Sequence, residues 1–138
     1  MLLIAIDGLF LILSGCFGLV ADLVSYLAGV GPFGAIFHGD AVVIGVVEAH
    51  GLAVLTGIAA WAGRARSSRR YWHWHLAATH LLLGGANIAF FDVFERVRAW
   101  PGGIGVTAVH FALVILQIAF ALRGAPAAPI MDSGVQAP

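Results

Sequence analysis

The sequence contains no lysine, one cysteine and few charged residues of either sign. Charged side chains make up 10% of its 138 residues, whereas hydrophobic side chains make up 61%. Soluble domains are roughly half apolar, so this composition predicts a membrane protein. The formal net charge is zero and the seven basic residues are spread over separate segments, so no nucleic-acid partner is expected. Cys16 alone allows no intrachain disulfide and no thiolate metal cluster.

Local motifs of well-known enzyme classes are also missing. The sequence has no G-x-S-x-G nucleophile elbow, no P-loop, no dinucleotide fingerprint and no H-E-x-x-H zinc motif. Any catalytic or binding site must therefore be built from residues that lie far apart in the sequence.

Four apolar segments are long enough to cross a bilayer, which takes about 20 residues. They cover about residues 2–29, 41–62, 72–94 and 104–122. The sequence thus predicts an all-α fold, an integral membrane four-helix bundle over residues 1–124, followed by a disordered tail at 125–138. The first segment lacks a basic start and a small-residue cleavage site, so we expect a retained span and not a signal peptide.

The arginines predict the orientation of the bundle. Four of the seven lie within 64–70 and a fifth is Arg123, whereas only Arg96 and Arg98 lie on the other side. Because positive charge is retained in the cytoplasm, both termini and the loop at 63–71 are predicted to be cytoplasmic. The predicted location is a bacterial inner (plasma) membrane.

Five polar residues of the predicted spans fall at a similar depth. Counting 1.5 Å per residue from the span ends places four of them roughly 9–12 Å below the outer boundary, with His50 slightly deeper. The five are Asp22, Glu48, His50, Asn87 and His110. Ionisable side chains inside a membrane are costly and usually have a partner or a function. These residues are therefore the predicted site, lining one cavity toward the outer leaflet.

Helical periodicity predicts which residues face the interior. Small or polar residues recur every seven positions in three sets, namely Gly8, Gly15 and Asp22; His73, His80 and Asn87; His110 and Gln117. Seven residues return to nearly the same helical face, so each set forms a stripe suited to a bundle interior. Glu48 and His50 lie about 200° apart on their helix, so we expect each to lean toward a different neighbouring helix.

Other polar residues have secondary roles in this interpretation. The secondary site candidates are His80, which shares a face with Asn87, and two residues at the outer rim, Asp40 and Asp92. Two residues are predicted nearer the cytoplasmic boundary: His73 is interfacial, and Asp7 is solvated or paired there.

The sequence also contains a faint internal repeat. GVVEAH at 45–50 aligns with GVTAVH at 105–110, and LSGCFGLVAD at 13–22 aligns with LGGANIAFFD at 83–92. A real duplication would relate two helical hairpins by an axis along the membrane normal. It would make symmetry mates of His50 and His110, and of Asp22 and Asp92.

The favoured function is metal-independent acid–base catalysis on a lipophilic small molecule within the membrane lipids. Apolar surroundings disfavour the charged forms of both a carboxyl group and an imidazole, which suits proton transfer between them. Such a site could protonate an alkene or epoxide or move a proton between carbons, as in an isomerase, cyclase or epoxide hydrolase. Asn87 would orient a substrate oxygen or an attacking water. No cofactor is favoured.

Other functions fit the same residues. His50 and His110 could ligate a haem iron axially, or bind a divalent metal together with Glu48 and Asp22. The acids and histidines could instead form the relay of a proton- or ion-coupled transporter, for which four short spans would need a homo-oligomer. A purely structural subunit of a larger complex is the remaining alternative.

Overall fold

The computed structural model describes residues 1–65 and 68–123, and every regular element in these ranges is a helix. The helices are α1 (Leu2–Ala28), α2 (Gly34–Phe37), α3 (Val43–Gly63), α4 (Arg69–Ala89), α5 (Phe91–Arg96) and α6 (Trp100–Arg123). The prediction of an all-α fold is confirmed. The tail predicted at 125–138 lies outside the described residues.

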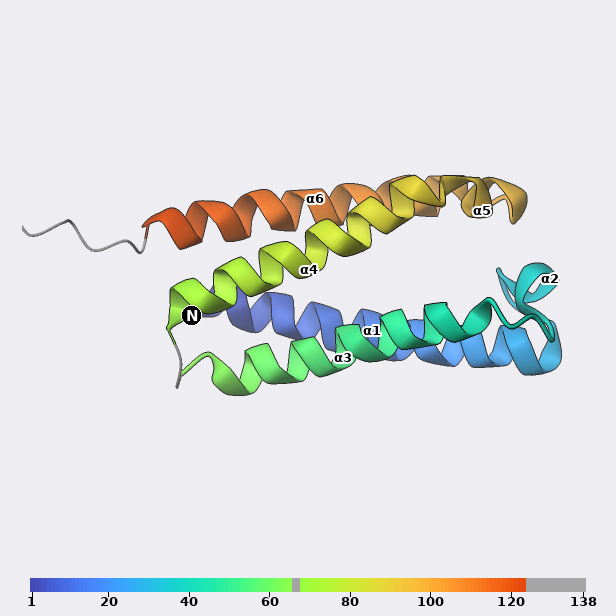
Figure 1. Ribbon diagram of the computed structural model, residues 1–138, viewed down its shortest axis with the longest axis horizontal. Helices are drawn as coiled ribbons and strands as arrows, with labels where there is room; N and C mark the ends of the chain where they lie inside the picture. The colour runs from blue at the N-terminus through green and yellow to red at the C-terminus, as the bar shows by residue number, and fades with distance from the viewer. Residues whose placement is uncertain (66–67, 124–138) are drawn as a thin grey trace, which may run out of the picture.

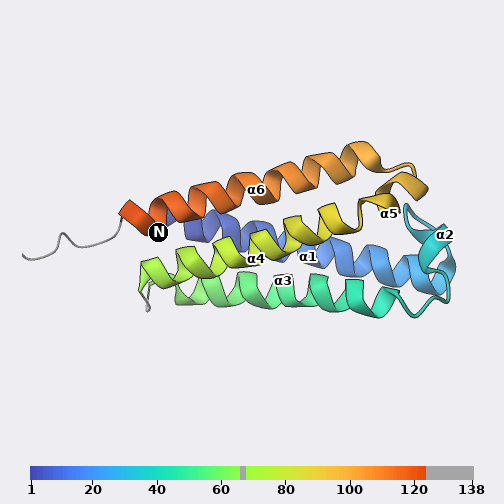
Figure 2. The same cartoon turned by 45° about the horizontal axis from the view of Figure 1, so that its top comes forward.

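The four long helices form two antiparallel hairpins, α1 with α3 and α4 with α6 (Figure 1). A short helix lies at the turn of each hairpin, α2 in the first and α5 in the second, and both short helices lie at the same end of the molecule (Figure 2). The start of α1 and the end of α6 lie at the opposite end. Packing is much more extensive within each hairpin than between the hairpins. The four-span bundle and the sequence repeat stay predictions.

Within the described residues, three helices are long and apolar enough to cross a membrane, namely α1, α3 and α6. Helix α4 is long enough, but three histidines, an asparagine and two arginines lower its mean hydropathy. The predicted span at 72–94 also differs in its end, because α4 stops at Ala89. Phe90 leaves the helical conformation, with φ −114° and ψ 31°, before α5 begins.

The exposed surface of the helices is more apolar than their buried faces. Phe17 is 77% exposed and Leu82 is 74% exposed, in company with many other leucines, isoleucines and valines. The buried positions instead include several polar residues: Asp7, Asp22, Ser25, His73, His80, His110 and Gln117. Exposing such an apolar surface to water is unfavourable, whereas contact with lipid acyl chains is not. The three apolar helices are thus compatible with membrane insertion.

Glycines allow α1 and α3 to approach closely. A Cβ atom added to Gly57 would lie 2.5 Å from the carbonyl oxygen of Gly8, and one added to Gly15 would lie 2.8 Å from the carbonyl oxygen of His50. Helices in lipid commonly associate through such small residues. The predicted stripe of Gly8, Gly15 and Asp22 therefore faces the interior, against α3.

Candidate functional site

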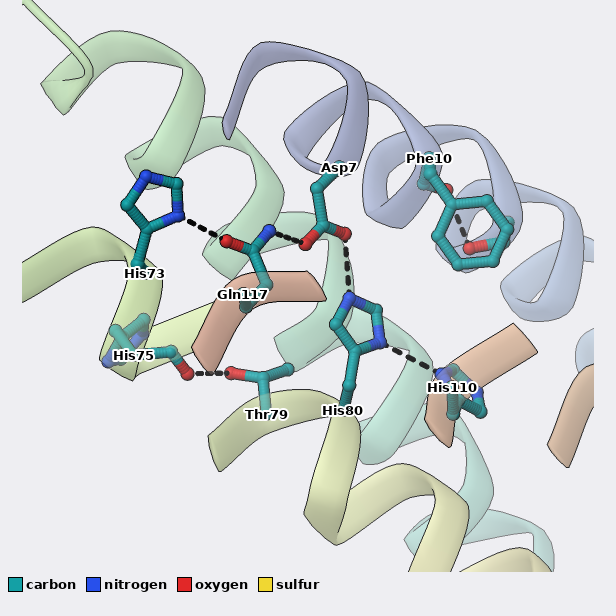
Figure 3. Close-up of polar contacts among 9 residues, drawn as sticks. Asp7, Phe10, His73, His75, Thr79, His80, His110 and Gln117 are labelled. Atoms are coloured by element: carbon teal, nitrogen blue, oxygen red, sulfur yellow. Dashed lines mark hydrogen bonds and ion pairs between the residues drawn. The ribbon is translucent and has the colours of Figure 1, made fainter. Parts of the chain in front are cut away.

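A chain of hydrogen bonds crosses the contact between the two hairpins (Figure 3). Nε2 of His80 on α4 lies 2.6 Å from Oδ1 of Asp7 on α1, and Nδ1 of His80 lies 2.9 Å from Nδ1 of His110 on α6. Gln117 on α6 donates from Nε2 to Oδ2 of Asp7. The Oε1 atom of Gln117 is paired with Nδ1 of His73 on α4. We call these five residues the Asp7 network.

The Asp7 network is almost completely enclosed by protein. Asp7, His80 and Gln117 have no exposed surface, and His73 and His110 are 5% and 8% exposed. A buried carboxylate is costly unless it accepts hydrogen bonds, and here each oxygen of Asp7 has a donor. The network therefore contains three imidazoles and one carboxyl group: His80 contacts both Asp7 and His110, and His73 is joined to Asp7 through Gln117.

One assignment of hydrogens satisfies every contact in the network. An ionised Asp7 accepts from Nε2–H of His80 and from the Gln117 amide. Neutral His80 then has no hydrogen on Nδ1, which accepts from Nδ1–H of His110, and Nδ1–H of His73 donates to Gln117. This assignment leaves a lone pair on Nε2 of His110, an atom with no hydrogen-bond partner in the described ranges. Nε2 of His110 is thus the basic end of the network.

Heptad spacing on two antiparallel helices positions these side chains. His73 and His80 are seven residues apart on α4, and His110 and Gln117 are seven apart on α6. Because seven residues return to nearly the same face, His73 meets Gln117 while His80 meets His110. The ring of Phe10, one turn beyond Asp7 on α1, lies beside both imidazoles, with centroid distances of 6.1 Å to His80 and 6.4 Å to His110.

A second acid–histidine pair lies inside the first hairpin. Oδ2 of Asp22 on α1 lies 2.6 Å from Nδ1 of His50 on α3. Asp22 is buried, whereas the His50 side chain is 37% exposed. The absence of a side chain at Gly18 makes room for His50, because a Cβ atom there would overlap the imidazole. Asp7 and Asp22 are separated by roughly 22 Å along α1, so the pair is separate from the Asp7 network.

The structure does not bring the five predicted site residues together as one cluster. Asp22 contacts His50, whereas His110 belongs to the Asp7 network. Glu48 is exposed, and it borders an open groove between α1 and α3. Asn87 is half-buried, and its side chain has no hydrogen bond to the described part of the chain. Because Glu48 is two residues from His50, it points away when His50 turns toward α1.

The secondary candidates have different surroundings. His80 lies at the centre of the Asp7 network. Asp40 is exposed, and its Oδ1 accepts a hydrogen bond of 2.9 Å from the backbone of Val42. Asp92 is also exposed and pairs with Arg96 at 2.8 Å. The two rim aspartates are thus solvated or locally paired, and Asp92 does not reproduce the contact of Asp22, its mate in the predicted repeat.

Three members of the network were not among the predicted site residues. Asp7 was expected to be solvated or paired near the boundary, and it is paired: α4 and α6 cover it and supply His80 and Gln117. His73 was expected to be interfacial but is buried against Gln117. One sequence signal could have found Asp7: its spacing from Asp22 is close to four helical turns, which places both on one face.

The histidines do not converge on one point. In the described part of the chain, no group of three or more His, Cys, Asp or Glu side chains is arranged to hold a metal ion. His80 directs its two ring nitrogens to different partners, Asp7 and His110. Haem or metal ligation by His50 and His110 stays a prediction, as does a divalent site that also uses Asp22.

Comparisons with protein families, with curated proteins and with solved structures find no match to this chain. The part of the chain that the structure describes is all-helical, with three apolar helices compatible with a membrane and a buried polar network between its two hairpins.

Proposed function

We propose that this protein is an integral membrane protein that performs acid–base chemistry on a lipophilic small molecule, with His110 as the group that exchanges a proton with the substrate. The observation that carries the proposal is the continuous contact from His110 through His80 to Asp7. Buried titratable groups are costly in a membrane interior and generally mark functional sites there.

Proton transfer through the two imidazoles explains why they are in contact. When Nε2 of His110 takes a proton from the substrate, the proton on Nδ1 of His110 can pass to Nδ1 of His80. His80 then carries hydrogen on both nitrogens, and its positive charge lies beside the carboxylate of Asp7. An aspartate supports a histidine base in the same way in hydrolase triads. Returning the proton to another substrate atom would complete an isomerisation, a cyclisation or the opening of an epoxide.

Gln117 favours local chemistry over conduction of protons along the helices. Its amide donates to Asp7 and accepts from His73, so it holds the carboxylate in place. An amide does not take up and release protons as an imidazole does. A relay from His110 would therefore stop at Asp7, which makes a transporter the less favoured function.

The surface around His110 suits a lipophilic substrate. His110 is 8% exposed, so its edge reaches the surface of α6. Val106, one turn away on the same helix, and Val109 are both exposed apolar residues. A substrate dissolved in lipid could approach His110 without crossing water.

The internal duplication, the orientation and the cellular location are part of the same proposal. Both hairpins have the order long helix, short helix, long helix, which supports a duplicated unit. The ends of α3 and α6 and the start of α4 lie together with the start of α1, and this end carries Arg64, Arg69, Arg70 and Arg123. By the positive-inside rule this end would be cytoplasmic. The proposed location is the bacterial inner (plasma) membrane.

Exchange of solvent protons into substrates tests the function without knowledge of the natural substrate. The protein in lipid nanodiscs would be incubated in heavy water with a panel of lipophilic ketones, alkenes and epoxides, and mass spectrometry would measure deuterium incorporation and ring opening. His110→Asn should lower the rate by at least about 10²-fold. His75→Asn is the matched control, because His75 lies on α4 outside the network and stacks on Tyr71. Equal rates for wild type and His110→Asn would contradict the proposal.

Nitrogen-15 NMR of the histidines provides a test that needs no substrate. The proposed relay requires hydrogen on Nε2 of His80 and on Nδ1 of His110 in the resting protein. If His110 instead carries its hydrogen on Nε2 while His80 is neutral, His110 cannot act as the base in this way.

A further inference from the structure

We propose that the end of the molecule where α4 begins and α6 ends holds the phosphate headgroup of an anionic lipid. A cavity of about 460 Å³ lies at this end. Its lining residues come from the ends of α1, α4 and α6 and the turn before α4, and they are Met1, Ser68, Arg69, Arg70, His73, Phe120 and Arg123. We call this cavity the arginine pocket. The proposal does not depend on the acid–base function.

Three arginines line the arginine pocket. Arg69 and Arg70 come from the first turn of α4 and Arg123 from the last turn of α6, and no acidic side chain is among the lining residues within 1–65 and 68–123. Arg123 lies over the ring of Phe120, with 5.7 Å from the guanidinium carbon to the ring centroid. Like charges in one cavity repel each other. A phosphate placed among the three arginines would attract each of them and offset that repulsion. The planar guanidinium also matches phosphate oxygens with two parallel hydrogen bonds.

The helix dipole strengthens the preference for an anion. The N-terminus of α4 is the positive end of its dipole, so Arg69 and Arg70 are unfavourably placed there in the absence of an anion. The first turn of α4 contains no acidic residue, and Ser68 makes no side-chain capping hydrogen bond. The positive-inside rule accounts for arginines on this side of the membrane, but it does not require them to line one cavity.

His73 joins the arginine pocket to the protein interior. It is 95% buried by area, as its exposed fraction is 5%, and it lines the pocket while its Nδ1 is paired with Gln117. Gln117 in turn holds Asp7. A headgroup in the pocket would therefore lie beside a member of the Asp7 network.

The surroundings favour a lipid headgroup over free phosphate. Phe120 and Met1 add apolar surface to the lining, next to the charged groups. Tyr71 and Trp74 are exposed on α4 close to the pocket residues in sequence, and such aromatic residues favour the membrane–water interface. Basic pockets between helix ends on the cytoplasmic side are known to bind anionic headgroups.

The test uses the full chain in two kinds of nanodisc, phosphatidylcholine alone and phosphatidylcholine with a minority of phosphatidic acid. Native mass spectrometry would measure the affinity for phosphatidic acid, and the unfolding temperature would report stabilisation by bound lipid. Arg69→Gln combined with Arg70→Gln should weaken binding at least about tenfold, because two charge-assisted contacts are lost. Arg64→Gln should weaken it less than about threefold, since isolated surface charges contribute little.

Arg64 is a matched control because it lies at the same end of the molecule, at the end of α3, and stacks on Trp61 outside the pocket. Equal weakening by Arg64→Gln and the pocket variants would indicate diffuse attraction and overturn the proposal. So would equal stabilisation by inorganic phosphate in phosphatidylcholine discs, which would identify free phosphate as the ligand. If the double glutamine variant does not fold, Arg69→Lys with Arg70→Lys decides. Unchanged affinity there would overturn recognition by paired guanidinium hydrogen bonds, and a clear loss would support it.

Discussion

Nε2 of His80 lies 2.6 Å from Oδ1 of Asp7, across the boundary between the two hairpins, and neither side chain has any exposed surface. Packing between the hairpins is otherwise sparse. Hydrogen bonds between polar side chains help helices associate in lipid, where no hydrophobic force drives them together. The contact that supports the proposed relay therefore also connects the first helix of the chain to the second hairpin.

Asp7→Asn should separate the chemical role of Asp7 from its structural role. The asparagine oxygen can still accept from His80, and a flipped Gln117 amide can accept from the new NH2 group and donate to His73 in its other tautomer. Stability should thus fall by less than about 1.5 kcal/mol, in the range of one interhelical hydrogen bond in a membrane. The negative charge that stabilises protonated His80 is lost, so deuterium exchange should slow about 10²–10⁴-fold.

Asp22→Asn is the control for this substitution. Asp22 lies on the same helix, is equally buried and also contacts a histidine, but it belongs to the separate pair with His50. Its exchange rate should stay close to that of the wild type. A large loss for Asp22→Asn with none for Asp7→Asn would move the site to the first hairpin.

Gly57→Ala should loosen the crossing of α1 and α3. The added Cβ would lie 2.5 Å from the carbonyl oxygen of Gly8, and backbone cannot give way as the end of a flexible side chain can. Overpacking of this kind typically costs about 1–3 kcal/mol, which unfolding in mixed micelles with added denaturing detergent would measure. Gly51→Ala on the same helix meets nothing within 4 Å. It should be neutral or stabilising by up to about 1 kcal/mol through helix propensity. Equal effects would show that the close crossing contributes nothing.

The sequence predicts which face of each helix points inward more reliably than it predicts which helices pack against each other. The spacing of His73 and His80, and of His110 and Gln117, fixes the inward face of each helix whatever its neighbours are. A depth estimated from the number of residues to the end of the helix predicts that Asp7 lies near water. Such an estimate takes no account of the neighbouring helices, which cover Asp7. The sequence also does not state which helices pair closely, and this decides that His110 contacts His80 and not His50.

The position of His50 depends on a feature that depth and phase do not reveal. Its imidazole occupies the space left by the missing side chain of Gly18, and it meets Asp22 there. The predicted cavity needed His50, Glu48 and His110 at one place. Instead, His50 packs between α1 and α3 in the first hairpin, and Glu48 lies on the exposed face of α3.

Glu48→Gln tests the difference between the cavity predicted from sequence and the Asp7 network. If Glu48 were a general acid or base, its loss would lower the exchange rate by at least about 10²-fold. Glu48 is exposed, and it borders a groove that no member of the Asp7 network lines. We therefore expect exchange within about threefold of wild type and a change in stability within about 0.5 kcal/mol. Abolished exchange in a stably folded Glu48→Gln protein would move the reacting site from the Asp7 network to the groove beside Glu48.

Cysteine labelling tests the orientation of the whole arrangement. In a Cys16→Ser background, Ala65→Cys lies in the exposed turn after α3 and Gly102→Cys lies in the exposed first turn of α6, at the opposite end of the molecule. The arginines beside Ala65 should keep that end in the cytoplasm. A membrane-impermeant maleimide added to intact cells should therefore react with Cys at 102 and reach Cys at 65 only after the cells are opened. Labelling of position 65 from outside would place the arginine pocket on the outer face, where the anionic lipids of the cytoplasmic leaflet are absent. That result would overturn both the orientation and the proposed source of the headgroup, while leaving the His110–His80–Asp7 relay to be judged by proton exchange alone.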